Sequence, residues 1–123
     1  MTRELAASTL KRLSRRLEEE QTRLETIIVE HEREREESKL AEASADRSPD
    51  PDNVDGGAIE VEMEIDLAMI QNARDLLERV RHAQNRMEKG QYGICEVTGE
   101  PIPVARLEAL PYATTTVEAA SRI

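Results

Sequence analysis

The chain has almost no aromatic side chains: its 123 residues include two tyrosines and neither phenylalanine nor tryptophan. A compact globular core needs large apolar side chains, so this composition argues against one. Charged residues make up 35% of the chain. Long helices that bury only a narrow apolar stripe fit both observations.

The chain also lacks a second cysteine, a long apolar run and an apolar signal-peptide core. The single cysteine, Cys95, excludes an internal disulfide and is compatible with a reducing compartment. No segment stays apolar for the roughly 20 residues that a membrane span requires. The first 16 residues include basic side chains without the apolar stretch of an export signal. We therefore expect a cytoplasmic protein without a membrane partner.

The negative charge is concentrated in one segment of the chain. The formal net charge is −9, and residues 46–66 contribute −7 of it, with eight acidic side chains against Arg47 alone. Binding to a phosphate backbone depends on lysine and arginine side chains that displace counterions. Sequence-specific DNA binding is therefore not expected.

A heptad seam predicts a first helix over about residues 3–45. From Leu10 the seam positions advance alternately by three and four residues, and they are mainly apolar as far as Ile27. Beyond that point the seam is polar, and His31 occupies one of its positions. A histidine at such a position is more often a packed or half-exposed seam residue than a ligand, and we interpret His31 in that way.

A break rich in proline and aspartate, residues 46–57, separates this helix from a second one over about residues 58–89. Its two prolines disfavour helix in the residues that precede them. A second seam follows the break, and Gly90 is a suitable helix stop. Two helices joined by a short turn form an antiparallel hairpin. We therefore predict a mainly α fold with a long coiled-coil hairpin over residues 1–89.

Residues 90–123, hereafter the finger segment, are rich in glycine, proline and β-branched residues. We predict a short strand at residues 92–97, one or two helical turns at residues 104–110 and a second strand at residues 113–117. A segment of this size cannot build a core by itself. It therefore needs the ends of the two helices, a metal ion, or both.

The stretch YGICEVTGEPIPVARLEALP, residues 92–111, resembles the zinc-finger region of the DksA/TraR family of bacterial transcription factors. The upstream hairpin and the acidic turn DNVDGGA also resemble that family, whose turn reads D-x-x-D-R-A. The resemblance implies a small degenerate zinc-finger-like α+β subdomain at the base of the hairpin. The matching finger positions are Gly99, Ile102, Arg106, Leu107, Glu108, Ala109 and Pro111.

The family's four zinc-ligand positions fall here on Cys95, Thr98, Thr116 and Ala119. A structural zinc site needs four thiolate or imidazole ligands, so we predict that the finger segment holds no metal. Cys95 is then expected to be a small buried residue. Packing against the helix ends would hold the finger segment together, through the apolar residues Tyr92, Ile94, Val97, Ile102, Val104, Leu107, Leu110, Tyr112 and Val117.

The resemblance also implies a function, which is regulation of transcription through bacterial RNA polymerase. In the family the hairpin enters the secondary channel of the polymerase, and paired aspartates at its tip modulate initiation. Those aspartates correspond to Asp52 and Asp55. Asp50, Asn53 and Gly56 are the supporting tip residues, and Gly56 replaces the family's arginine.

Basic residues outside the tip are candidates for contact with the polymerase, namely Arg79, Arg86 and Arg106. In the family's best-known members the response to the alarmone ppGpp depends on basic residues of the second helix and after the last cysteine. The corresponding positions here include Ala68, Asn72, Arg79 and Ala120, of which only Arg79 is basic. We therefore do not expect the protein's action to depend on ppGpp. We also expect the protein to be a monomer.

Two other functions remain open. The chain is alternatively a structural or adaptor coiled coil that self-associates, or a polymerase binder whose inert tip only blocks the channel. On either alternative, residues 46–57 are a solvated turn with a helix cap. The sequence contains no glycine-rich phosphate loop, nucleophile triad or convergent acid–base pair, so we expect neither catalysis nor a cofactor.

Overall fold

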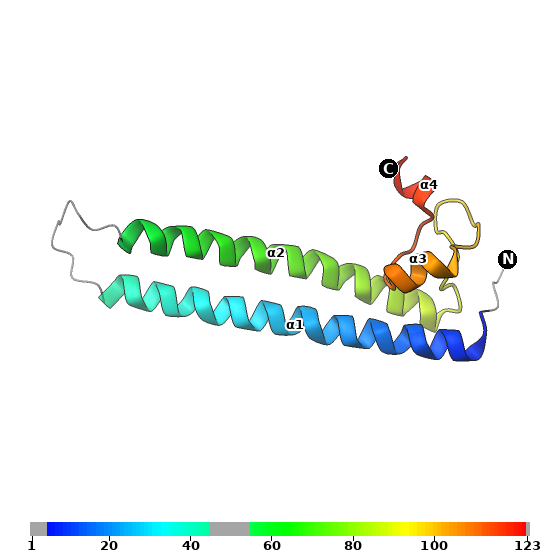
Figure 1. Ribbon diagram of the computed structural model, residues 1–123, viewed down its shortest axis with the longest axis horizontal. Helices are drawn as coiled ribbons and strands as arrows, with labels where there is room; N and C mark the ends of the chain where they lie inside the picture. The colour runs from blue at the N-terminus through cyan, green and yellow to red at the C-terminus, as the bar shows by residue number, and fades with distance from the viewer. Residues whose placement is uncertain (1–4, 45–54, 123) are drawn as a thin grey trace. The chain divides into compact units, whose positions relative to one another are not determined.

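Two long helices dominate the structure, a computed structural model that describes residues 5–44 and 55–122. The side chains of residues 44, 55 and 56 are not described. The long helices confirm the mainly α fold, and their ends lie within four residues of the expected ones. The elements are α1 (Ala7–Ser44), α2 (Asp55–Glu88), α3 (Val104–Ala109) and α4 (Val117–Ala120) (Figure 1).

The chain forms two compact units, and each long helix contributes one part to each of them. Unit 1 comprises Met1–Arg23 and Leu76–Ile123, and unit 2 comprises Leu24–Asp75. Within each unit the parts of α1 and α2 run antiparallel (Figure 1). The finger segment therefore belongs to the same unit as the first turns of α1 and the last turns of α2.

The heptad seams form the buried face of both long helices. In unit 2, Leu24, Ile70 and Ala73 are at most 2% exposed. In unit 1, seam residues from both helices are likewise buried together with apolar residues of the finger segment. The buried apolar residues of unit 1 are Leu13, Leu17, Leu77, Val80, Ala83, Tyr92, Cys95, Ile102, Leu107, Ala113 and Ala119.

The strands expected at residues 92–97 and 113–117 do not form. One isolated antiparallel bridge joins Ile94 and Pro101. The chain turns too tightly here for a ladder, because the Cys95 N–H already donates to the Glu100 carbonyl at 2.7 Å. The second stretch leads directly into α4, so the described finger segment consists of turns and two short helices.

Three residues expected in the core of the finger segment are instead exposed. Val97 and Val117 are each 57% exposed, and Leu110 is 37% exposed. Val97 lies in the turn after Cys95, and Val117 begins a four-residue helix whose buried side is supplied by Ala119. Tyr92, Ile102 and Leu107 are buried as expected, whereas Ile94, Val104 and Tyr112 are half-buried.

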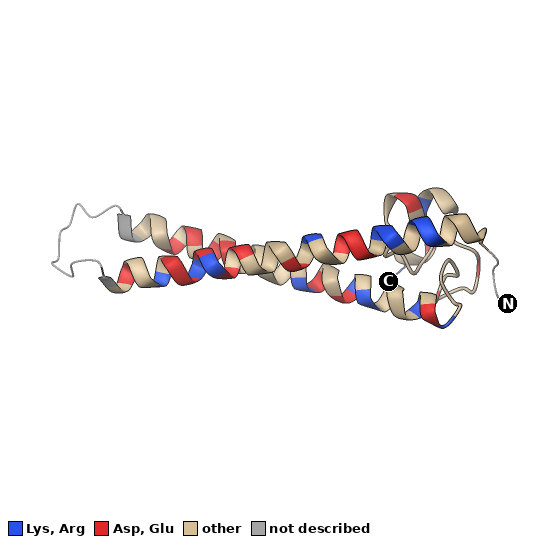
Figure 2. Cartoon of the chain, turned by 90° about the horizontal axis from the view of Figure 1, so that it is seen from below, with Lys and Arg blue, Asp and Glu red and all other residues tan. Residues whose placement is uncertain are grey.

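Charged side chains occur along the whole described length of both long helices (Figure 2). They surround the narrow apolar seam that each helix buries. Across the described part of the chain, no helix is apolar enough over a sufficient length to cross a membrane.

Candidate functional site

The predicted acidic tip lies largely outside the described residues. Asp50, Asp52 and Asn53 fall in the stretch that the structure does not describe. Asp55 and Gly56 begin α2, and only their backbone is described. The role assigned to these five residues stays a prediction.

The positions that correspond to the family's zinc ligands come together in unit 1. Cys95 is 1% exposed, and its Sγ accepts a hydrogen bond from the Thr116 backbone N–H at 3.4 Å. The Thr116 hydroxyl lies 4.0 Å from the same sulfur and accepts from the Ala119 N–H at 3.2 Å, which caps α4. Thr98 also hydrogen bonds to the Cys95 thiol and lowers its pKa.

This group of residues does not fit a structural zinc ion. A tetrahedral zinc site takes four thiolate or imidazole ligands. Cys95 offers the one sulfur, Ala119 offers no ligand atom, and the hydroxyl of Thr116 is occupied in capping α4. We therefore derive no part of the function from a zinc ion in the finger segment.

The surroundings of Cys95 favour its thiolate. Burial raises the pKa of the thiol, but hydrogen bonds from Thr98 and from the backbone of Thr116 and Val97 outweigh that effect. The pKa falls from 9.0 to about 6. Because the folded pKa is lowered, the thiolate stabilises the fold fully above about pH 9, and this contribution is lost as the pH falls through about 6.

We expect the ultraviolet absorbance of the native thiolate to titrate near pH 6 and that of the denatured chain near pH 9. A pH titration of the intact protein, repeated in denaturant, measures both midpoints. Cys95→Ser provides the blank, because it removes the only thiol. A native midpoint above about pH 8 would contradict the hydrogen bonding described here.

Two of the three arginines proposed to contact the polymerase bond the backbone of their own unit. Arg86 donates to the carbonyl oxygens of Ile94 at 2.7 Å and Gln91 at 3.2 Å. Arg106 Nε donates to the Thr115 carbonyl at 2.8 Å. Both guanidinium groups therefore hold turns of the finger segment, whereas Arg79 is exposed on α2.

The stretch RLEALP, residues 106–111, ties the finger segment to α1. Glu108 forms an ion pair with Arg12, and its backbone carbonyl accepts from Arg16. The hydroxyl of Tyr92 donates to the Pro111 carbonyl at 2.7 Å. These bonds could not be predicted from the sequence, because their partners lie far apart in the chain.

The sequence likewise offered no partner for His82, which the structure pairs with Glu96. His82 Nε2 lies 2.8 Å from one Glu96 carboxylate oxygen, and the Thr114 hydroxyl donates to the other at 2.9 Å. Burial raises the pKa of Glu96, but these two hydrogen bonds together with the nearby charges of His82 and Arg86 lower it below its usual value. The interaction joins α2 to the finger segment within unit 1.

Comparison with protein families matches residues 90–123 to the prokaryotic dksA/traR C4-type zinc finger. The finger segment is therefore similar to the zinc finger of that family. The resemblance predicted from the sequence is thus confirmed, in a chain that retains one cysteine. Three of the four zinc-ligand positions of that finger carry threonine or alanine in this chain, and Thr116 hydrogen bonds to Cys95 and to Ala119 there.

Curated relatives match this chain over about half its length. General stress protein 16O of Bacillus subtilis (strain 168) is 46% identical over 65 residues, which are 53% of this chain and 40% of the relative. The RNA polymerase-binding transcription factor DksA of Caulobacter vibrioides is 44% identical over 68 residues, 55% of this chain and 48% of the relative. The chain spans about half the length of the curated relatives it matches or less.

Solved structures of DksA proteins share the fold over most of the chain. The transcription factor DksA2 from Pseudomonas aeruginosa has a TM-score of 0.76 and 26% identity, covering 94% of this chain and 83% of that chain. The RNA polymerase binding protein and transcriptional regulator Dks from Chlamydia trachomatis has a TM-score of 0.56 and 24% identity, covering 97% and 91%. The second likeness shows the fold alone.

Proposed function

We propose that this chain is a transcription regulator that binds bacterial RNA polymerase. The observation that carries the proposal is the fold likeness to the transcription factor DksA2 over 94% of this chain, together with the family match of the finger segment. The name of the Caulobacter relative, an RNA polymerase-binding transcription factor, supports the same partner. The chain would act as a monomer, without catalysis, sequence-specific DNA binding or dependence on ppGpp.

In the finer form of this proposal, the hairpin enters the secondary channel of the polymerase and presents Asp52 and Asp55 near the catalytic centre. Carboxylates there would contact basic residues or disturb the coordination of the active-site Mg²⁺. Asp50, Asn53 and Gly56 would shape the turn. The strongly acidic composition of residues 46–66 supports this assignment, because it disfavours competition for the DNA itself.

The arginine contacts divide the candidate polymerase-binding residues into two groups. Arg79 would contact the polymerase directly, because its side chain is exposed. Arg86 and Arg106 would instead contribute by fixing the turns of the finger segment, since each donates to backbone carbonyls there. Substitution of Arg86 or Arg106 should therefore weaken binding by disturbing the fold of the finger segment. Substitution of Arg79 should leave that fold intact.

The double variant Asp52→Ala/Asp55→Ala is expected to keep its affinity for core RNA polymerase and to lose its effect on transcript output. The reason is that the proposal separates the contacts that hold the protein from the carboxylates that act. Affinity is measured with the purified polymerase, and output with an in vitro transcription assay. The matched control is Glu18→Ala/Glu19→Ala, which removes the same charge from exposed positions of α1.

The other outcomes identify different functions. If the tip variant retains both binding and its effect on transcription, the tip is inert and the protein blocks the channel. If the wild-type chain does not bind the polymerase at all, the proposed function is wrong. Loss of binding in both double variants would indicate a general charge effect and would refute the specific role of the tip.

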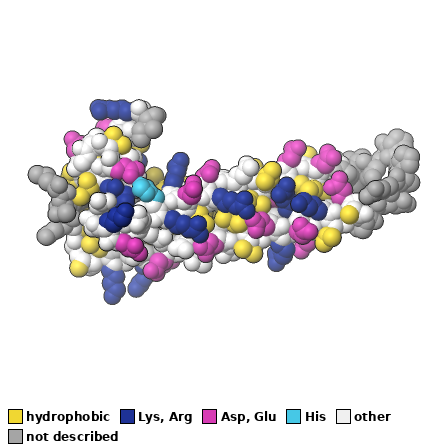
Figure 3. Space-filling view, turned by 180° about the vertical axis from the view of Figure 1, so that it is seen from behind, with side chains coloured by type: hydrophobic (Ala, Val, Ile, Leu, Met, Phe, Trp, Pro, Cys, Tyr) yellow, Lys and Arg dark blue, Asp and Glu magenta, His cyan; other side chains and the backbone are white. Residues whose placement is uncertain are grey.

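Self-association as an adaptor is a second candidate, and one surface observation favours it. Val61, Ile65 and Met69 are 55%, 55% and 41% exposed and follow one another at four-residue spacing on α2. Such spacing places them on one helix face. Exposed apolar side chains also lie among charged ones on the face seen in Figure 3. A monomeric mass in solution would exclude this candidate.

A further inference from the structure

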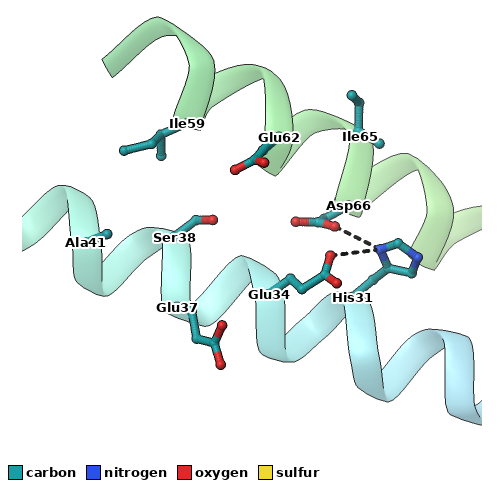
Figure 4. Close-up of a pocket in the computed structure, with 9 residues that line it drawn as sticks. All are labelled: His31, Glu34, Glu37, Ser38, Ala41, Ile59, Glu62, Ile65 and Asp66. Carbon is teal, nitrogen blue, oxygen red and sulfur yellow. Dashed lines mark hydrogen bonds and ion pairs between the residues drawn. The ribbon is translucent and has the colours of Figure 1, made fainter. Parts of the chain in front are cut away.

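Three metal-ligating side chains converge in unit 2, far in sequence from the finger segment. His31 Nδ1 lies 2.8 Å from Asp66 Oδ1 and 3.5 Å from Glu34 Oε2. One ligand atom from each residue lies within 4.8 Å of the other two. Figure 4 shows His31 and Glu34 on α1 pointing toward Asp66 on α2.

The burial of Asp66 sets this group apart from an ordinary acidic surface. Asp66 is 5% exposed, and it is the one charged residue among the buried polar residues of the described chain. It occupies a seam position, where an apolar side chain is expected. Burying a carboxylate there costs free energy unless a cation or hydrogen-bond donors compensate. His31 provides one such contact, and the neighbouring Glu34 adds a second carboxylate rather than a second cation.

A cavity of about 520 Å³ lies over these three residues. Four of its nine lining side chains are carboxylates, and none is lysine or arginine. The volume is large enough for several water molecules, each of which takes up about 30 Å³ in the liquid. The cavity therefore has an acidic lining and enough space for water molecules. The lining residues are His31, Glu34, Glu37, Ser38, Ala41, Ile59, Glu62, Ile65 and Asp66 (Figure 4).

We propose that His31, Glu34 and Asp66 form a binding site for a divalent transition-metal ion, with Zn²⁺ as its simplest occupant. One imidazole nitrogen and two carboxylate oxygens make up a donor set that suits zinc, cobalt and nickel ions. Three protein ligands leave at least one coordination position, which water from the cavity fills. The sequence alone did not predict this site, because His31 and Asp66 were recognised only as polar residues on two separate seams.

The arrangement needs small movements to accept the ion. A tetrahedral ion with bonds of about 2.1 Å spaces its ligand atoms about 3.4 Å apart. The 3.5 Å between His31 Nδ1 and Glu34 Oε2 already meets this spacing, and the 2.8 Å contact to Asp66 opens by roughly 0.6 Å. The Glu34 side chain is 55% exposed, so it is free to adjust. The bound ion would join α1 to α2 within unit 2 and raise the stability of that unit.

The decisive variant is Glu34→Gln, which removes a charged ligand at an exposed position and keeps the size of the side chain. Its matched control is Glu37→Gln, because Glu37 lines the same cavity one helical turn away and points away from the cluster (Figure 4). Zinc affinity is measured by calorimetry on the intact protein, and visible absorption of bound Co²⁺ reports the ligand geometry. We expect Glu34→Gln to weaken zinc binding at least about tenfold and Glu37→Gln to leave it unchanged.

His31→Gln and Asp66→Asn should also weaken binding and should abolish the visible spectrum of tetrahedral Co²⁺. Cys95→Ser should bind zinc as the wild type does, which separates this site from the finger segment. The proposal is wrong if the wild-type chain binds no zinc up to about 1 mM, which corresponds to a binding free energy of about −4 kcal/mol. It is equally wrong if Glu34→Gln and Glu37→Gln bind zinc with the same affinity.

Discussion

Leu107→Ala is expected to lower the free energy of unfolding by about 2–5 kcal/mol, the range for truncation of a buried leucine. Leu107 lies on α3 and is 0% exposed. Its side chain is fully buried in the finger segment, so its truncation leaves a cavity there. Urea unfolding followed by circular dichroism measures the change.

Val97→Ala is the control for this experiment, because Val97 belongs to the same finger segment and is 57% exposed. A substitution at such a surface position should change the free energy of unfolding by no more than about 0.5 kcal/mol. Equal effects of the two substitutions would show that the finger segment is not packed as described. The comparison is informative because the apolar character of both residues led us to expect both in the core.

Leu17→Ala is expected to have an effect of similar size, about 2–5 kcal/mol, for a different reason. Leu17 is a seam residue of α1 with 0% exposure, and it is buried in unit 1. Alanine forms helix at least as well as leucine, so helix propensity does not contribute to the loss. The expected change therefore reports tertiary packing alone. Thermal and urea unfolding both measure it.

Leu40→Ala makes the same chemical change on the same helix at a position that is 61% exposed. It should leave the unfolding midpoint almost unchanged. A loss below about 1 kcal/mol for Leu17→Ala would mean that this part of α1 does not pack against the rest of unit 1 as described. Together the two leucines test whether the heptad seam, rather than helix formation as such, stabilises the chain.

The long helices could be predicted from the sequence because their signal is periodic and extends over many residues. From Leu10 onward, the seam residues are spaced alternately three and four positions apart, which predicts one buried face of a long helix. The seam of α2 shows the same spacing. The finger segment could not be predicted as well. Its β-branched residues favour strands, but a tight turn between Cys95 and Glu100 uses the backbone groups that a ladder would need.

The positions around Cys95 could be found only through the family motif, since threonine and alanine do not mark a site by themselves. The structure then shows Thr116 bonded to both Cys95 and Ala119. The cluster of His31 with Asp66 could not be predicted without knowing the register between the two helices. That register depends on the length and path of the intervening turn, which a heptad pattern does not give. Polar residues on both seams were its one visible sign.

The ion pair between Arg12 and Glu108 has a consequence for the order in which the chain folds. Its partners are 96 residues apart, whereas His31 and Asp66 are 35 apart. Contacts between distant residues form late, because closing a longer loop costs more conformational entropy. At about 5–20 residues per second, a ribosome needs roughly 5–20 s to pass from Arg12 to Glu108. Throughout that interval the first turns of α1 lack the contacts that Arg12 and Arg16 make with Glu108, so these contacts form only after most of the chain has been synthesised.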